Sequence, residues 1–284
     1  SHRLSITLSC KRILNGEWLV ASNNDSIQKT LLVAILLCLF CSIIVAGAAV
    51  SLKPLQIANK QLDKNKNILA AAGLLVEGTS IEEQFKQITT RIVNLETSAY
   101  ATDAELAEIS AAGFNPEAFD QKKSSKNPKL SAKLDANKDI ASIKRLEKFA
   151  AIYTIEKDGA VEKMILPVHG YGLWSTLYGF LALEGDLETV IGLGFYSHAE
   201  TPGLGGEVDN PSWKAQWVGK KLYNSEGDLS IRVIKGKAAP GSLHDVDGLS
   251  GATLTGRGVS NLVNFWLGKD AFGPFLSAAK AGGA

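Results

Sequence analysis

The sequence predicts an α+β protein, with a single transmembrane helix near the N-terminus followed by a soluble domain in which helices flank an antiparallel sheet. Three observations lead to this prediction. Thr30 to Leu52 form an apolar run without a charged residue. Between residues 149 and 255, apolar segments of strand length flank Asp-Gly or Gly-Asp pairs. After residue 253, apolar residues recur at spacings of three and four, which is typical of a helix.

The apolar run from Thr30 to Leu52 is long enough to cross a bilayer. At about 1.5 Å per residue it would span about 34 Å as a helix. It has no polar stripe, which a buried helix of a soluble protein would show. The run also continues past Ala46-Gly47-Ala48, a weak match to a signal-peptide cleavage site, so we expect an uncleaved anchor over 30–52. Flanking lysines and arginines number three before it and four after it, which leaves the orientation undecided.

The residues before the anchor are expected to form an N-terminal tail, 1–29. The chain does not begin with Met, and its single Met is Met164. We therefore interpret residues 1–20 as an expression remnant or a misassigned start, with Val20 at the true start. Within the anchor, Cys38 and Cys41 share one helix face; we interpret them as small apolar residues. A metal site shared with neighbouring chains is the alternative.

Residues 53–145 are expected to form a helical or α+β region close to the membrane. The pattern predicts that the anchor continues as a helix from Pro54 to Val76 and that Ser80 to Thr97 is helical. A strand beginning at residues 92–95 is the alternative for the second segment. The lysine-rich stretch from Gln121 to Asp139 is interpreted as a solvated loop, with a docking surface for an anionic partner or lipid headgroups as the alternative.

The next part of the chain reads as a series of strands. Asp158-Gly159 lies between strand patterns at 151–155 and 161–168, which predicts a hairpin. Gly185-Asp186 lies between a second pair, at 177–183 and 189–195, and a further strand is predicted over 229–234. The domain is expected to cover 146–270 and to close with the helix after residue 253. A Gly/Ala-rich tail is expected over 271–284.

Composition excludes several classes of protein. The chain has 284 residues and a formal charge of +1, which argues against nucleic-acid binding. It has no phosphate-binding Walker loop and no paired Cys-x-x-Cys motifs. Ser250, His244 and Asp247 suggest a hydrolase, but spacings of three residues along one loop make a catalytic relay geometrically awkward. The segment also fails the Gly-x-Ser-x-Gly pattern. His169 and His198 could likewise suggest metal or nucleophile chemistry.

The most informative motif is Asp247-Gly248-Leu249-Ser250-Gly251-Ala252-Thr253. Its small residues allow a bulky group to approach the backbone, and the predicted helix start offers N–H groups and a positive dipole end to a phosphate. The motif resembles the flavinylation signature Asp-x-x-Ser-Gly-Ala-Thr of FMN-binding domains. An ordinary N-cap at Ser250 or Thr253 is the alternative.

Two further segments resemble the same family. His198-Ala199-Glu200-Thr201-Pro202-Gly203-Leu204-Gly205 should form a type II turn at Pro202-Gly203. Gly170-Tyr171-Gly172-Leu173-Trp174-Ser175 matches a third family segment. With the anchor, the resemblance extends from Ala21 to the C-terminus. The chain resembles the C subunits of sodium-translocating NADH:quinone oxidoreductases, and the G subunits of Rnf electron-transport complexes are a related family.

The resemblance implies a covalent FMN, joined by a phosphoester to Thr253. It further implies that Ser250, Gly251 and Ala252 surround the phosphate and that Lys235 neutralises it. Thr201 and Leu204 are expected against the flavin, with Trp174 stacking near the ring or else lying in the core. Glu200 is expected either to hydrogen-bond the ring or to stabilise the turn. Asp247 is expected to serve flavin attachment.

The function implied is electron transfer from NADH toward ubiquinone, coupled to Na+ export by a six-subunit complex. This chain would be one subunit of the oxidoreductase, without a complete active site of its own. The implied partners are the flavin-bearing B subunit, the metal-centre D and E subunits, an FAD-dependent flavin transferase and the bilayer. The soluble domain is expected on the periplasmic side of a bacterial inner membrane. The alternatives are an Rnf-type ferredoxin:NAD subunit and a flavin-free tethered assembly module.

Overall fold

The computed structural model describes residues 26–282. The predictions for residues 1–20 therefore lie outside the described part. The described chain divides into two compact units, one up to Ala58 and the other from Asn59 onward. We describe each unit by itself.

The first unit consists of the N-terminal part of helix α1 (Ile27–Ala71). Among the described residues, α1 is the one helix long and apolar enough to cross a membrane, and none of its most apolar stretch is buried. The helix contains Pro54 and continues beyond it, as the sequence predicts, although it ends at Ala71 instead of Val76. Cys38 and Cys41 are free and exposed on it. The described residues contain no group of three or more His, Cys, Asp or Glu side chains that could hold a metal ion.

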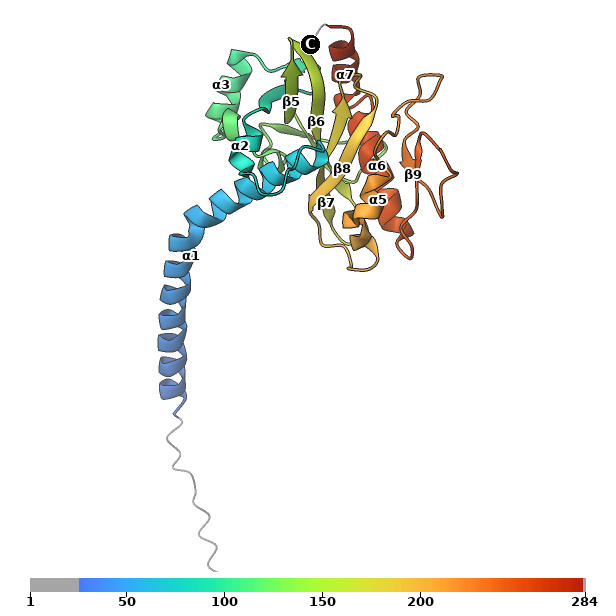
Figure 1. The fold of residues 1–284 in the computed structure, drawn as a ribbon. Helices are drawn as coiled ribbons and strands as arrows, with labels where there is room; N and C mark the ends of the chain where they lie inside the picture. Colours follow the sequence, from blue (N-terminus) through green and yellow to red (C-terminus); the bar gives the residue numbers. More distant parts are fainter. Residues whose placement is uncertain (1–25, 283–284) are drawn as a thin grey trace, which may run out of the picture. The chain divides into compact units, whose positions relative to one another are not determined.

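The second unit is built on a six-stranded antiparallel sheet in the order β2-β1-β5-β6-β7-β8 (Figure 1). Both predicted hairpins are confirmed. Asp158 and Gly159 both have positive φ, of 53° and 80°, as the tight turn between β5 and β6 requires. The strands are β1 (Thr89–Asn94), β2 (Ala99–Tyr100), β5 (Phe149–Lys157), β6 (Ala160–Tyr171), β7 (Thr176–Glu184) and β8 (Val190–Ser197).

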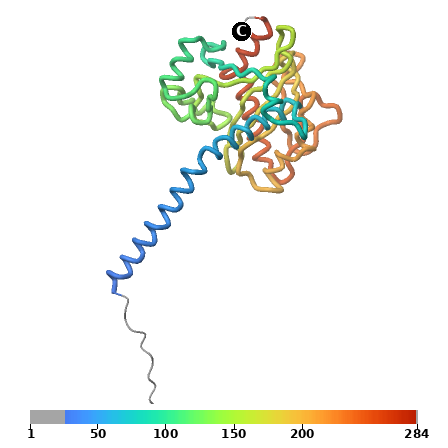
Figure 2. The backbone as a smooth tube through the Cα atoms, turned by 60° about the vertical axis from the view of Figure 1, so that its left-hand side comes forward, coloured from blue at the N-terminus to red at the C-terminus, as the bar shows by residue number. Residues whose placement is uncertain are grey.

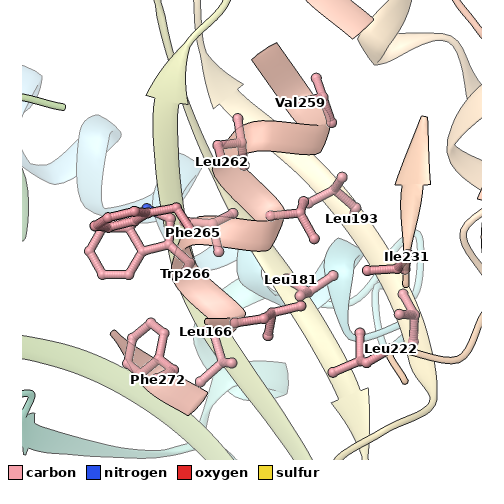
Figure 3. Close-up of a cluster of buried hydrophobic side chains, with 14 of the residues drawn as sticks. Leu166, Leu181, Leu193, Leu222, Ile231, Val259, Leu262, Phe265, Trp266 and Phe272 are labelled. Atoms are coloured by element: carbon pink, nitrogen blue, oxygen red, sulfur yellow. The ribbon is translucent and has the colours of Figure 1, made fainter. Parts of the chain in front are cut away.

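Both faces of the sheet are covered, because side chains alternate between two apolar clusters. On one face, Leu166, Leu181 and Leu193 pack with helix α6 (Thr253–Leu267) and helix α7 (Phe272–Lys280) (Figure 3). Helix α6 packs on β6, and α7 packs on α6; both lie in the orange-to-red C-terminal part of the chain in Figure 2. On the other face, Ile165 and Phe180 pack with the end of α1 and with helix α3 (Asp103–Ala111).

Smaller elements connect these layers. They are α2 (Ile81–Phe85), η1 (Pro116–Ala118), α4 (Gln121–Ser124), β3 (Ser131–Lys133), β4 (Arg145–Glu147), η2 (Gly205–Asp209), α5 (Pro211–Ala215), β9 (Arg232–Val233) and β10 (Asp245–Val246). The antiparallel pair β3-β4 and the parallel pair β9-β10 form two small sheets of their own.

Four local predictions differ from the structure. The helix predicted over Ser80–Thr97 is confined to α2, and strand β1 follows it; the alternative strand was right in kind but begins at Thr89. The loop predicted over 121–139 contains α4 and β3. The strand predicted over 229–234 is reduced to β9. The segment 271–284 contains helix α7, whose Phe272, Phe275 and Leu276 are buried and complete the core beside α6.

Candidate functional site

The motif 247–253 leads directly into the main helix of the domain. Helix α6 begins at Thr253, as the sequence predicts, and Thr253 is exposed while Ala252 before it is buried. The N-cap is Ala252, which has no side-chain cap, so the alternative of an N-cap at Ser250 or Thr253 is wrong. Gly256 donates the helix's first backbone bond, to Ala252, 3.0 Å away. The backbone N–H groups that precede Gly256 in the first turn have no partner within the helix, and they are therefore directed toward a group attached at Thr253.

The turn at 201–204 lies against this motif. Gly203 has φ +75°, and the N–H of Leu204 donates to the carbonyl of Thr201 at 3.1 Å, which confirms the predicted turn. Gly251 has φ +70°, and a Cβ placed on it would lie 2.9 Å from Cδ2 of Leu204. Gly251 is therefore needed for its backbone conformation, and its missing Cβ lets the Leu204 side chain approach.

Glu200 joins all three motif segments. Its carboxylate accepts hydrogen bonds from the N–H groups of residues 173–175, at 3.0–3.3 Å, and from the Ser175 hydroxyl at 3.1 Å. It also accepts from the Thr255 hydroxyl, on the first turn of α6, at 2.7 Å. Burial alone would raise the pKa of Glu200, but the hydrogen bonds from Thr255 and from the Trp174 and Leu173 amides lower it below the ordinary value.

The space around this carboxylate requires two glycines. A Cβ on Gly205 would lie 2.6 Å from the Thr255 hydroxyl and 2.8 Å from a Glu200 oxygen. A Cβ on Gly172 would also lie 2.8 Å from Glu200. The sequence prediction missed Ser175, Thr255 and Gly205 as positioning residues. For Gly205 a signal was present, because it closes the motif that contains Glu200.

Large apolar side chains remain exposed near the start of α6. Trp174 is 67% exposed, which excludes the core position considered as its alternative. Leu204 and Leu254 are also exposed, and Leu254 directly follows Thr253. Exposed apolar groups around a helix start form a surface on which a flat ring can lie, with its phosphate at the helix end.

Asp247 is used to hold the loop before the motif. Its carboxylate accepts from the Ala238 N–H at 2.7 Å and from Gln216 Nε2 at 3.3 Å. Its own N–H donates to Gln216 Oε1 at 2.9 Å, and its carbonyl accepts from Trp213 Nε1 at 2.8 Å. Sequence reasoning missed Trp213 and Gln216 as partners of the motif, because no local pattern links them to it.

Lys235 is exposed and lies beside the same loop. Its chain neighbours Ile234 and Gly236 contact Gly248 so closely that a Cβ on Gly248 would lie 2.4 Å from the Ile234 carbonyl. The position is compatible with a cation beside the motif.

The three histidines of the described residues do not form a hydrolytic site. His244 Nδ1 lies 2.9 Å from the Lys221 carbonyl, and Asp247 is occupied by Ala238 and Gln216. His198 Nε2 pairs with Asp209 at 2.8 Å. His169 is buried on β6 and stacks on Tyr178. The described residues therefore show no relay from Asp247 through His244 to Ser250.

The residues at this site fit a flavin phosphate. An exposed hydroxyl stands at an uncapped helix start, beside a left-handed glycine and exposed apolar side chains. In agreement with this geometry, a family model described as "FMN-binding domain" matches residues 172–268. The matched range contains every residue that is expected to bind or attach the flavin. The fold and the site thus define a protein with an FMN-binding domain.

Comparisons of the whole chain identify the family more closely. The C subunit of a Na(+)-translocating NADH-quinone reductase from Pseudomonas aeruginosa is 53% identical over 270 residues, covering 93% of this chain and all of that protein. The corresponding C subunit from Yersinia pestis is 46% identical, covering 92% of this chain and 96% of that protein. The crystal structure of Shewanella oneidensis NqrC superposes with a TM-score of 0.70 at 34% identity, over 79% of this chain and 99% of that one.

This chain belongs to the C-subunit family of Na(+)-translocating NADH-quinone reductases. It is accordingly a flavoprotein subunit of a membrane oxidoreductase complex. Of the two related families that the motifs resemble, the sodium-translocating one is confirmed.

Proposed function

We propose that this chain carries FMN as a phosphoester on the Thr253 hydroxyl and relays electrons within the complex, from NADH toward ubiquinone. The observation that carries the proposal is the position of Thr253: its exposed side chain stands at the first residue of α6, and the first-turn amides there have no side-chain cap. FMN, when bound, supplies the electron-transfer chemistry.

The chain's own residues position and surround this group. Ser250, Gly251 and Ala252 line the approach to the phosphate, and Lys235 supplies a positive charge beside the loop. Thr201 and Leu204 lie against the flavin through the turn at Pro202-Gly203, and Trp174 provides an exposed aromatic face. Glu200 acts as a positioning residue, because it fixes the segment 173–175 and the first turn of α6 to each other.

Attachment requires a separate flavin transferase that uses FAD. The Thr253 oxygen attacks the flavin-side phosphorus of FAD, the pyrophosphate bond breaks, AMP leaves, and the hydroxyl proton passes to a base of the transferase. We propose that Asp247 serves this step by holding the loop in the form that the transferase accepts. The contacts to Ala238 and Gln216 support this role.

We further propose that the domain lies on the periplasmic side of the inner membrane, anchored by α1. Its electron donors and acceptors there are the metal centre of the D and E subunits and the flavin-bearing B subunit. An attached flavin cannot be lost from a compartment in which free FMN is not supplied. The length and apolar character of α1 support the single anchor.

The test is in-gel fluorescence of the denatured full chain, coexpressed with its flavin transferase. We expect a fluorescent band for the wild type and for Thr253→Ser, and a dark band for Thr253→Ala. The Thr253→Ser variant is the matched control, because it keeps a hydroxyl at the same position. A dark wild-type band, with the transferase active on another acceptor, would leave a flavin-free tethered module.

A further inference from the structure

A cavity lies beside the third motif segment, of which it uses only Tyr171. Its volume is about 570 Å³, within the range of roughly 300–1,000 Å³ typical of small-molecule sites. Three basic residues and three aromatic residues line it: Lys126, Lys144, Arg145, His169, Tyr171 and Tyr178. None of its lining residues is acidic. Most of the lining lies outside residues 172–268, which the FMN-binding domain model matches.

The inner wall of the cavity is formed by a buried histidine that has a buried acid behind it. His169 is 7% exposed and stacks on Tyr178, with ring centroids 5.3 Å apart. Its Nε2 lies 3.6 Å from Glu147 Oε1, too far for a hydrogen bond, and neither Glu147 oxygen has a hydrogen-bond partner among the described residues. Burial raises the pKa of Glu147 to about 8 and lowers the pKa of His169 to about 4. At neutral pH this wall is therefore uncharged and does not offset the charge of the basic rim.

The rim loop has an unusual backbone. Ser142 and Lys144 both have positive φ, 54° and 66°, although neither is glycine. The Asp139 carboxylate holds the loop in this form by accepting from the Ile143 and Lys144 amides at 2.8 and 2.7 Å. Such strained residues cluster at ligand sites, where the surrounding structure supports them.

A further positive charge lies at the aromatic wall. Lys122 Nζ is 4.0 Å from the centroid of the Tyr178 ring. Burial and the nearby charges of Lys60 and Lys126 lower the pKa of Lys122, and the charge of Asp120 raises it in part. Lysines that repel one another in this way favour an anion that would neutralise them.

We propose that this cavity binds a small anion that carries a planar ring, of about the size of a mononucleotide. The ring stacks against the exposed Tyr171, and the anionic group lies between Lys126 and Lys144. The cavity shares no residue with the phosphate position at Thr253. If the cavity binds no such anion, the proposed flavin attachment is therefore unaffected.

The test uses AMP as the probe, with adenosine and ribose 5-phosphate as its two halves. Equilibrium dialysis against the flavin-loaded full chain in detergent, at low salt, measures the three affinities. We expect AMP to bind about tenfold more tightly than either half. AMP that does not bind, or ribose 5-phosphate that binds equally well, would overturn the proposal.

Variants then locate the site. The double variant Lys126→Ala/Lys144→Gly removes both charges, and glycine accepts the positive φ at 144 without strain. We expect it to weaken AMP binding about tenfold and to leave adenosine binding unchanged. The matched control Lys133→Ala/Lys157→Ala removes two exposed lysines outside the cavity. It should change neither the affinity for AMP nor the affinity for adenosine. Equal AMP binding by the double variant and the wild type would contradict the assignment.

Discussion

Replacing Glu200 by Gln should loosen the site, because this carboxylate fixes residues 173–175 to the first turn of α6. Hydrogen bonds to a charged acceptor contribute about 1.5–3 kcal/mol each. Gln keeps the shape and can still accept some of these bonds, but its NH₂ group would face N–H and O–H donors. Glu200 is only 5% exposed, but Gln keeps part of the hydrogen bonding, so we expect a net loss of about 2 kcal/mol in unfolding free energy at pH 7.

The pH dependence of this loss is a second signature. The folded-state pKa of Glu200 lies below its ordinary value of 4.5, so its stabilisation is fully present above that pH. It is lost as the pH falls through the folded-state pKa. The difference between wild type and Glu200→Gln should therefore be constant from pH 8 to pH 5 and shrink on further acidification.

The assay is urea unfolding of the full chain in detergent micelles, followed by fluorescence of the buried tryptophans. The control is Glu207→Gln, because the Glu207 carboxylate accepts a single side-chain hydrogen bond within the described residues, from Asn210 at 2.8 Å. We expect the control to change stability by less than about 0.5 kcal/mol. A Glu200→Gln variant as stable as the control at pH 7, or a difference that grows in acid, would refute the reasoning.

Three further predictions concern packing, buried charge and topology. Gly205→Ala should destabilise the chain by about 1–3 kcal/mol and reduce flavin incorporation, because the added Cβ would meet Thr255 and Glu200. The control Gly194→Ala should be nearly neutral, because no atom lies within 4 Å of its added Cβ. Equal urea midpoints for the two variants would contradict this prediction. As the pH rises from 4.5 to 8, Glu147→Gln should become more stable relative to wild type by roughly 1 kcal/mol per pH unit, because the pKa of buried Glu147 is raised to about 8 and the wild type loses stability over this range. A pH-independent difference in urea titrations would show that Glu147 is not buried as a neutral acid. A cysteine replacing exposed Lys157, in a chain without the native cysteines, should react with an impermeant maleimide added to spheroplasts; labelling only in inverted vesicles would place the domain in the cytoplasm.

Much of the fold was predictable because its signals are local. Asp158-Gly159 determines a hairpin through the positive φ of both residues. The apolar spacing after Thr253 predicts α6, whose Val259, Leu262 and Trp266 are fully buried. The segment Ser80–Thr97 was misread because Ile88 and Ile92 have helical spacing, while β1 is determined by its pairing with β5 some 60 residues later.

The site was predictable in its motifs but not in its contacts. The motif residues Thr253 and Leu204 could be named from the sequence. The bonds from Glu200 to Thr255 and from Asp247 to Gln216 join residues 55 and 31 positions apart, and only the fold brings them together. The cavity beside His169 could not be predicted for the same reason, since its lining extends from Ser125 to Tyr178.

The most direct test of the account is mass spectrometry of the tryptic peptide 238–257, released from the chain purified from its native membrane. Cleavage after Lys237 and Arg257 isolates the whole motif in one peptide. The account predicts a mass increase equal to FMN less one water, with fragment ions that place it on Thr253. An unmodified peptide, or a flavin placed on Ser250 or Thr255, would contradict it.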